Sequence, residues 1–245
     1  MTKLFITLFS ILTVSTSVIA ETDKIEVLNG VQLRSGKKND VRSYVGQIER
    51  HFSFPIELVK KGVTNFSDKC NNQFKDKRKF TKDLGNCKYH NDNLVESFVI
   101  KNIKNSEKFK NYNEAYLLGR VVYNRGSFGF YELVTITEGK NHLNQRTISI
   151  ATRMLEDKEA KVYTNTKMSK ESAFDQSSTR FILTEISPNE TKVKYEYKAT
   201  TDHWILNKEV SVPQVFASMS KSINDLIQTI EDESTIQKRE LASNE

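Results

Sequence analysis

The feature that most limits the fold of this 245-residue chain is a series of short segments, between residues 94 and 200, in which apolar and polar side chains alternate. The clearest is Thr191–Thr200, where Val193, Tyr195 and Tyr197 share one parity and lysines and a glutamate occupy the other. Because successive side chains of a strand point to opposite faces, this pattern predicts a strand with one buried and one solvated face. Such strands are typical of antiparallel sheets.

Turn-forming residues separate these segments, so the chain is expected to form an antiparallel meander. The predicted strands are Leu94–Lys101, Ala115–Tyr123, Gly129–Glu138, Arg146–Leu155, Lys161–Lys167, Thr179–Ser187 and Thr191–Thr200. An earlier strand is predicted from Tyr44 to Phe54, because its apolar residues again fall on one parity. Pro55 ends that strand and favours the first turn of an amphipathic helix, or a pair of helices, reaching about Lys82.

A long amphipathic helix is expected to follow the meander. Ser211-Val212-Pro213 is a start signal, and the apolar residues from Val215 to Ile230 recur at helical spacing. Residues 232–245 are charged and lose this stripe, which predicts a polar, frayed tail. At the other end, residues 21–41 are polar and rich in turn residues, which predicts a flexible leader.

Residues 1–20 have the pattern of a cleavable secretory signal. Lys3 precedes a mostly apolar stretch, Leu4–Val14, and Val18-Ile19-Ala20 places short residues before Glu21. A membrane-anchoring helix is the alternative, but the apolar stretch is shorter than the roughly 20 residues that a span needs. The mature protein is therefore expected to be periplasmic or secreted.

The chain contains two cysteines, Cys70 and Cys87. In an oxidising compartment a lone pair is most simply a disulfide, and a metal pair or a reactive thiol are the alternatives. The intervening segment is basic, which is consistent with either a solvated helix face or a contact with an anionic membrane surface. Its cations are Lys75, Lys77, Arg78, Lys79 and Lys82.

Composition and motifs exclude several classes of function. The 37 Lys and Arg residues against 31 Asp and Glu residues make the chain mildly basic, but basic and aromatic residues do not interleave along one face, so no nucleic-acid partner is expected. The four histidines show no metal-ligand spacing, and neither a catalytic nor a cofactor motif is present. Asp202-His203-Trp204 is the one suggestive group. Because neighbours in an extended segment point to opposite sides, a structural or ligand-anchoring role is preferred to general-base catalysis.

The predicted order of elements resembles the helix-grip fold of the START and polyketide-cyclase-like (SRPBCC) superfamily. The similarity would cover about Arg42–Glu231. The segments that carry it are Phe52-Ser53-Phe54-Pro55-Ile56-Glu57-Leu58-Val59, Asn65-Phe66-Ser67, Phe181-Ile182-Leu183-Thr184, Thr191-Lys192-Val193-Lys194-Tyr195-Glu196-Tyr197 and the Pro213–Ile230 helix. The resemblance implies an α+β fold, in which a curved antiparallel sheet of six or seven strands wraps around the C-terminal helix. The expected export, the disulfide and an insert at Asn102–Asn113 depart from many members.

The resemblance also implies a cavity between sheet and helix that binds or carries a lipid or other hydrophobic small molecule, without a cofactor or a metal. The candidate ligand contacts are Tyr131, Tyr163, Tyr195, Tyr197 and Trp204. Each inward tyrosine could instead belong to the core, with a satisfied hydroxyl. The alternatives are a cyclase- or hydrolase-like enzyme that uses the same cavity, and an envelope-associated interaction protein whose core is filled, because a fold does not fix a function.

Overall fold

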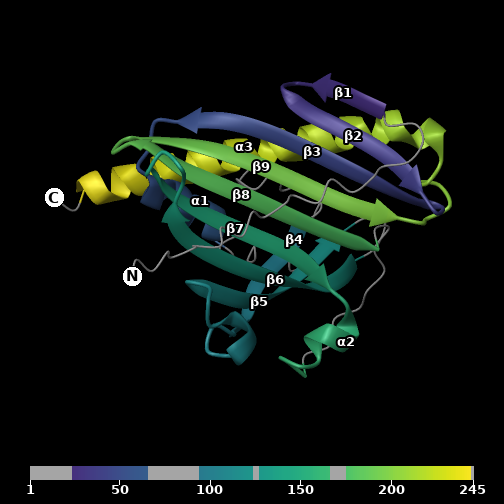
Figure 1. Ribbon diagram of the computed structural model, residues 1–245, viewed down its shortest axis with the longest axis horizontal. Coiled ribbons are helices and arrows are strands. Elements are labelled where there is room, and N and C mark those ends of the chain that lie inside the picture. The colour runs from purple at the N-terminus through teal and green to yellow at the C-terminus, as the bar shows by residue number, and fades with distance from the viewer. Residues whose placement is uncertain (1–23, 66–93, 124–126, 166–174, 244–245) are drawn as a thin grey trace, which may run out of the picture.

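The computed structural model (Figure 1) describes residues 24–65, 94–123, 127–165 and 175–243. The predicted signal segment at residues 1–20 lies outside the described residues, as do Cys70 and Cys87 with their predicted disulfide. The same holds for the basic residues Lys75, Lys77, Arg78, Lys79 and Lys82.

The described chain forms one antiparallel sheet of nine strands in the order β1-β2-β3-β9-β8-β7-β6-β5-β4. The meander from β4 to β9 is continuous, and β3 closes against β9, so that Phe52 lies opposite Thr191. The strands are β1 (Lys24–Leu28), β2 (Val31–Lys38), β3 (Val41–Phe52), β4 (Leu94–Asn102), β5 (Glu114–Tyr123), β6 (Ser127–Lys140), β7 (Arg146–Leu155), β8 (Gln176–Ser187) and β9 (Glu190–Thr201).

Two helices pack on one face of this sheet, which we call the inner face. The helix α1 (Ile56–Thr64) begins directly after Pro55, and α3 (Val212–Ser243) runs behind the strands in Figure 1. The short helices η2 (Glu107–Phe109), α2 (Asp157–Ala160) and η3 (Glu209–Ser211) lie in the connections. The prediction of an α+β helix-grip fold is confirmed, with nine strands in place of six or seven.

The prediction of a flexible leader at residues 21–41 is wrong for the described residues 24–41, because they form β1 and β2. Val31, Leu33 and Ser35 are buried and alternate with exposed neighbours, as in any half-buried strand. Of the residues from Ser35 to Asp40 that suggested disorder, the first four belong to β2, and Asn39 and Asp40 form the turn to β3 with φ of 48° and 59°. Asn29 and Gly30 have φ of 50° and 78°, and two consecutive positive φ angles are what a tight antiparallel hairpin requires.

Two other boundaries differ from the sequence prediction. Lys161–Lys167 is not a strand over its described residues, since residues 161–163 form a turn after α2 and bring Tyr163 onto buried Phe109. The predicted tail at 232–245 is helical as far as Ser243. There α3 packs closely against α1, since an added Cβ on Gly62 would lie 3.1 Å from the carbonyl oxygen of Ile230 and 3.4 Å from Ser234 Oγ.

The apolar core is divided between the two faces of the sheet. The main core fills the space between the inner face and the helices, and its largest fully buried side chains include Tyr44, Phe52 and Phe216. A second cluster lies on the outer face, where the insert at 102–113 and α2 cover Leu117, Leu133 and Leu155. The expected insert therefore shields apolar surface of the sheet.

Candidate functional site

The inner face is apolar along the middle of strands β5 to β9. Strand alternation turns Leu118, Val134 and Ile150 toward the helices, and all three are fully buried. On β8 and β9, Phe181 and Tyr195 continue this surface with ring centroids 4.5 Å apart. An apolar band therefore crosses five strands of the sheet.

A buried ion pair interrupts the apolar band. Arg120 shares the parity of Leu118 on β5, and Glu132 shares the parity of Val134 on β6, so both side chains lie on the inner face. The Nε of Arg120 lies 2.9 Å from Oε2 of Glu132, and the two side chains are only 11% and 15% exposed. Because removing charges from water is costly, a pair in this position needs further hydrogen bonds.

Hydroxyl groups on neighbouring strands supply these bonds. Arg120 also donates to the hydroxyl of Ser97, which is fully buried on β4. The hydroxyl of Thr152 donates to Oε1 of Glu132 over 2.8 Å and lies 2.9 Å from the hydroxyl of Thr179. The polar cluster, which we define as Ser97, Arg120, Glu132, Thr152 and Thr179, thus extends from β4 to β8.

Tyr197 and the crossing of α3 adjoin the polar cluster. In the sheet register Tyr197 lies beside Thr179, and Gly46 of β3 lies beside Tyr197. Burial and the charge of Glu132 raise the pKa of Tyr197 to about 12, so its phenol stays protonated and can donate a hydrogen bond. An added Cβ on Gly46 would lie 2.6 Å from Cδ1 of Ile223, so α3 crosses the sheet directly at this glycine.

A second charged network fastens α1 to the opposite end of the inner face. Lys60 of α1 lies 2.8 Å from both Glu114 and Glu138, and Arg146 contacts Glu138 at 2.7 Å. Hydrogen bonds from Arg146 and Lys60 lower the pKa of Glu138. Burial and the hydrogen bond to Glu114 raise the pKa of Tyr116 to about 12. These groups neutralise one another, which gives the network a structural role.

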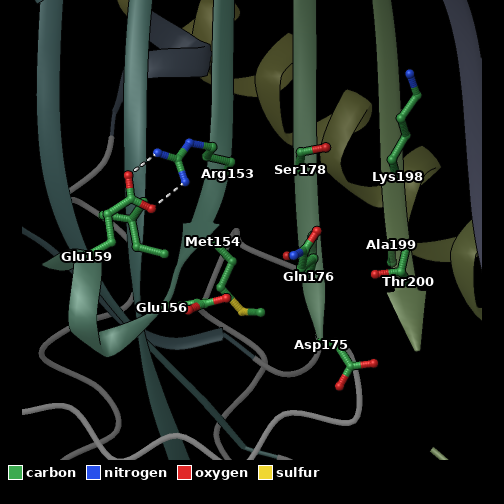
Figure 2. A pocket seen from close by; sticks show the side chains of 12 residues that line it. Arg153, Met154, Glu156, Glu159, Asp175, Gln176, Ser178, Lys198, Ala199 and Thr200 are labelled. Atoms are coloured by element: carbon green, nitrogen blue, oxygen red, sulfur yellow. Dashed lines mark hydrogen bonds and ion pairs between the residues drawn. The ribbon is translucent and has the colours of Figure 1, made fainter. Parts of the chain in front are cut away.

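An open pocket of about 440 Å³ lies at the ends of β7 to β9, away from the polar cluster (Figure 2). Its main charged feature is the pair of hydrogen bonds between Arg153 and Glu159, one of them 2.8 Å long. Arg153 and, more weakly, Lys108 lower the pKa of Glu159 to about 2. This pair ties α2 to the outer face of β7.

Low pH is expected to weaken the ion pair between Arg153 and Glu159. Because the pKa of Glu159 is lower in the folded chain than in the unfolded chain, its contribution to stability is complete above about pH 4.5 and is lost as the pH falls toward 2. The Glu159→Gln variant should therefore lose less stability than the wild type between pH 6 and pH 2 in urea titrations. Glu107→Gln, at an exposed glutamate of η2, is the control. If both variants showed the same reduction in the pH dependence of stability, the loss could not be assigned to Glu159.

The structure separates the five tyrosine and tryptophan residues predicted as ligand contacts. Tyr195 and Tyr197 lie on the inner face, as their parity indicated. Tyr131 and Tyr163 belong to the outer cluster, so their expected place beside the other two is wrong. Trp204 lies in the connection between β9 and α3 and is 68% exposed.

The sequence prediction missed the polar cluster. A signal was present, since Arg120 falls on the parity of Tyr116 and Leu118, and Glu132 falls on that of Val134 and Ile136. Opposite charges on the buried parity of two adjacent strands are unusual unless they pair. Only the register of β5 and β6, which places Leu118 opposite Glu132, brings the two side chains together.

Neither a protein-family model nor a curated protein sequence matches this chain. The structure of human STARD10 is similar to it, with a TM-score of 0.50, 10% sequence identity and coverage of 90% of this chain and 78% of that one. The chain has a START-like fold. Human StAR-related lipid transfer protein 5 has a TM-score of 0.49, 13% identity and 88% coverage of both chains. The Zhui aromatase/cyclase from Streptomyces has a TM-score of 0.44, 8% identity and coverage of 79% and 94%.

Two other kinds of site are absent from the residues that the structure describes. No three His, Cys, Asp or Glu side chains in these ranges come close enough together to hold a metal ion. No helix in the same ranges combines the length and apolar character needed to cross a bilayer.

Proposed function

We propose that this protein binds a lipid, or another hydrophobic molecule with one polar end, between the inner face of the sheet and α3. The apolar band would contact the hydrocarbon part of the ligand, and the polar cluster with Tyr197 would hold its polar end. We further propose that the protein does this after export, as the residues of its N-terminal segment suggest.

The observation that carries this proposal is the ion pair of Arg120 and Glu132 on an otherwise apolar surface. Replacing such a pair with apolar residues is often neutral or stabilising, so a stability requirement is a weak reason for its presence. Ligand sites for apolar molecules are mostly hydrophobic and contain a few polar groups that fix orientation. The inner face has this composition.

Binding agrees with the geometry better than catalysis does. Both charges of the polar cluster are engaged with each other and with hydroxyl groups, which suits them to hold a polar group. Asp202 and His203, the residues considered for general-base chemistry, lie on an exposed loop, and Nδ1 of His203 is 3.4 Å from the backbone nitrogen of Ile205. The START-like fold itself is compatible with either role.

The proposal is tested by binding of a fluorescent fatty acid, together with native mass spectrometry and organic extraction of the purified protein. Wild-type protein should bind the probe and retain lipid. Tyr197→Ala should weaken probe binding by about 5- to 150-fold, the effect of losing one buried aromatic contact. Tyr163→Ala is the matched control, because that ring packs on the outer cluster and should leave probe affinity unchanged.

Two results would overturn the proposal. Wild-type protein that binds neither a fatty acid nor a sterol probe, and that carries no extractable lipid, has no such site. A loss of probe binding in Tyr163→Ala but not in Tyr197→Ala would move the site to the outer face. Melting temperatures of both variants show whether a binding defect comes from unfolding.

A further inference from the structure

Four large apolar side chains are exposed at one end of the molecule. Trp204, Ile205 and Val210 lie in the connection between β9 and α3 and are 68%, 43% and 80% exposed. Val41 lies at the start of β3 and is 39% exposed. We call these four residues the apolar end patch.

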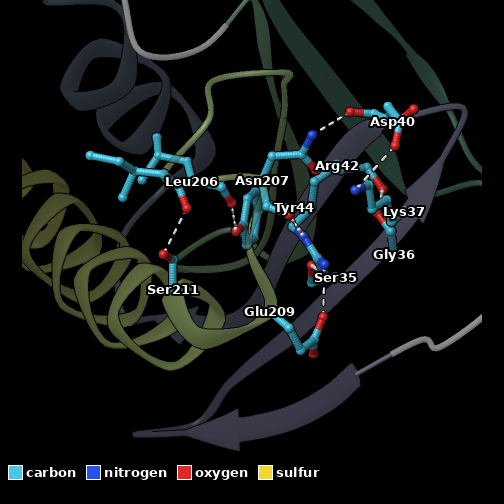
Figure 3. A network of polar contacts seen from close by, with 12 residues as sticks. Ser35, Gly36, Lys37, Asp40, Arg42, Tyr44, Leu206, Asn207, Glu209 and Ser211 are labelled. Atoms are coloured by element: carbon cyan, nitrogen blue, oxygen red, sulfur yellow. Dashed lines mark hydrogen bonds and ion pairs between the residues drawn. The ribbon is translucent and has the colours of Figure 1, made fainter.

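Polar contacts bring the two segments of the apolar end patch together. The side-chain amide of Asn207 donates a hydrogen bond to the carbonyl oxygen of Asp40, in the turn before β3. Arg42 Nε donates to the carbonyl oxygen of Asn207 over 3.1 Å. The turn at residues 39–41 and the loop at residues 202–211 are therefore held next to each other by the polar contacts drawn in Figure 3.

The same contacts fix the shape of the loop. Arg42 is 3% exposed, and its guanidinium also contacts Ser35 at 3.1 Å and Glu209 at 2.7 Å. Tyr44 donates to the carbonyl oxygen of Leu206 over 2.6 Å. Because these hydrogen bonds fix the backbone of the loop, the apolar side chains cannot turn inward without breaking the contacts of the buried Arg42 guanidinium. The fold therefore maintains their exposure.

The chemistry of the apolar end patch indicates the partner. Trp204 carries an amphipathic indole, and Nζ of Lys208 lies 5.1 Å from its ring centroid. Tryptophan and lysine of this kind are typical of the interface between lipid head groups and hydrocarbon. Four side chains are also far fewer than the roughly 20–30 residues that each partner contributes to a standard protein interface. The charged residues of the two segments nearly balance, with a net charge of +1, and they are Lys37, Lys38, Arg42, Lys208, Asp40, Asp202 and Glu209.

We propose that the apolar end patch inserts into the interface of a lipid bilayer. Because the net charge of the two segments is so small, insertion depends on apolar contact and does not require anionic lipid. The patch ends directly before α3, which crosses the sheet at Gly46 beside the polar cluster. The insertion of the patch does not depend on the proposed function. The role that we give to the insertion does rest on the proposed function, since a bilayer at this end could deliver or receive the ligand.

Trp204 is the only tryptophan in the chain, so its emission reports on this surface alone. Phosphatidylcholine vesicles should shift the emission of the full-length protein to shorter wavelength, protect it from acrylamide and allow quenching by brominated lipid. Val210→Asp should weaken vesicle binding by about tenfold or more while leaving the reporter in place. Leu143→Asp is the control, because Leu143 is 65% exposed in the turn between β6 and β7 and should bind like the wild type.

Binding should persist in 0.5 M salt, because the contact is apolar. Protein that sediments with vesicles without any change in Trp204 emission uses another surface, and protein that does not sediment has no membrane contact, so each result overturns the proposal. A monomeric short-chain lipid separates this test from the test of the proposed function. It should occupy the inner site without the shift in Trp204 emission that vesicles cause.

Discussion

Replacing Glu132 by glutamine is expected to lower the free energy of unfolding by about 3–5 kcal/mol, because it removes the carboxylate that pairs with the buried guanidinium of Arg120. The substitution keeps the size and shape of the side chain, so the loss would come from charge and not from packing. Urea titration of the purified variant measures the change, with circular dichroism as the signal for secondary structure.

A double variant tests whether the ion pair contributes to ligand binding independently of its effect on the stability of the fold. Arg120→Met combined with Glu132→Leu removes both charges and should fold with nearly wild-type stability. It should nevertheless lose affinity for a fatty-acid probe, since the polar end of the ligand then has no partner. A double variant that binds the probe as well as the wild type would show that the polar cluster does not hold the ligand.

Replacing Ile223 by aspartate is expected to prevent the chain from accumulating as folded protein. Ile223 is 3% exposed and faces Gly46 at the crossing of α3 and β3. A carboxylate in this position would lie among the apolar side chains of the main core, and burying an unpaired charge costs several kcal/mol. Soluble expression and the melting temperature measure the effect.

Ser218→Asp is the matched control, because Ser218 is an exposed position of the same helix. It should express and melt like the wild type. Ile223→Ala supplies a second measurement on a chain that still folds, and it should lose about 2–5 kcal/mol of stability. An Ile223→Asp protein that is soluble with an unchanged melting temperature would contradict the packing of α3 on the inner face.

The alternation of side chains was enough to predict most of the sheet, because one face of each strand is buried and the other is wet. Arg146–Leu155 was predicted with the bounds that the structure has. The first two strands were missed because each is joined by a tight turn of polar residues, which local composition alone does not distinguish from disorder. Their burial depends on β3 and α3, which lie elsewhere in the sequence.

The candidate site was predicted less well than the fold, because Arg120 and Glu132, which share the parity of apolar neighbours in their strands, were not identified as buried residues. Tyr195 and Tyr197 lie on the predicted face, whereas Tyr131 lies on the other face of the sheet. Parity within one strand shows which residues share a face of the sheet, but it does not show whether that face packs against the helices or against the outer cluster. The pairing of Arg120 with Glu132 follows from the register between two strands, which no single segment reveals.

The seam between β3 and β9 has a consequence for folding kinetics. Arg42 and Thr201 lie opposite each other in this pair, so the two halves of the sheet can join only when residues from distant parts of the chain meet. Contacts of such large sequence separation slow the folding of a sheet, because loop entropy is lost before the pairing contributes. During synthesis the first three strands emerge long before β9 and α3. Folding should therefore finish only after the whole chain has left the ribosome, and until then the inner face is a surface that a chaperone could recognise.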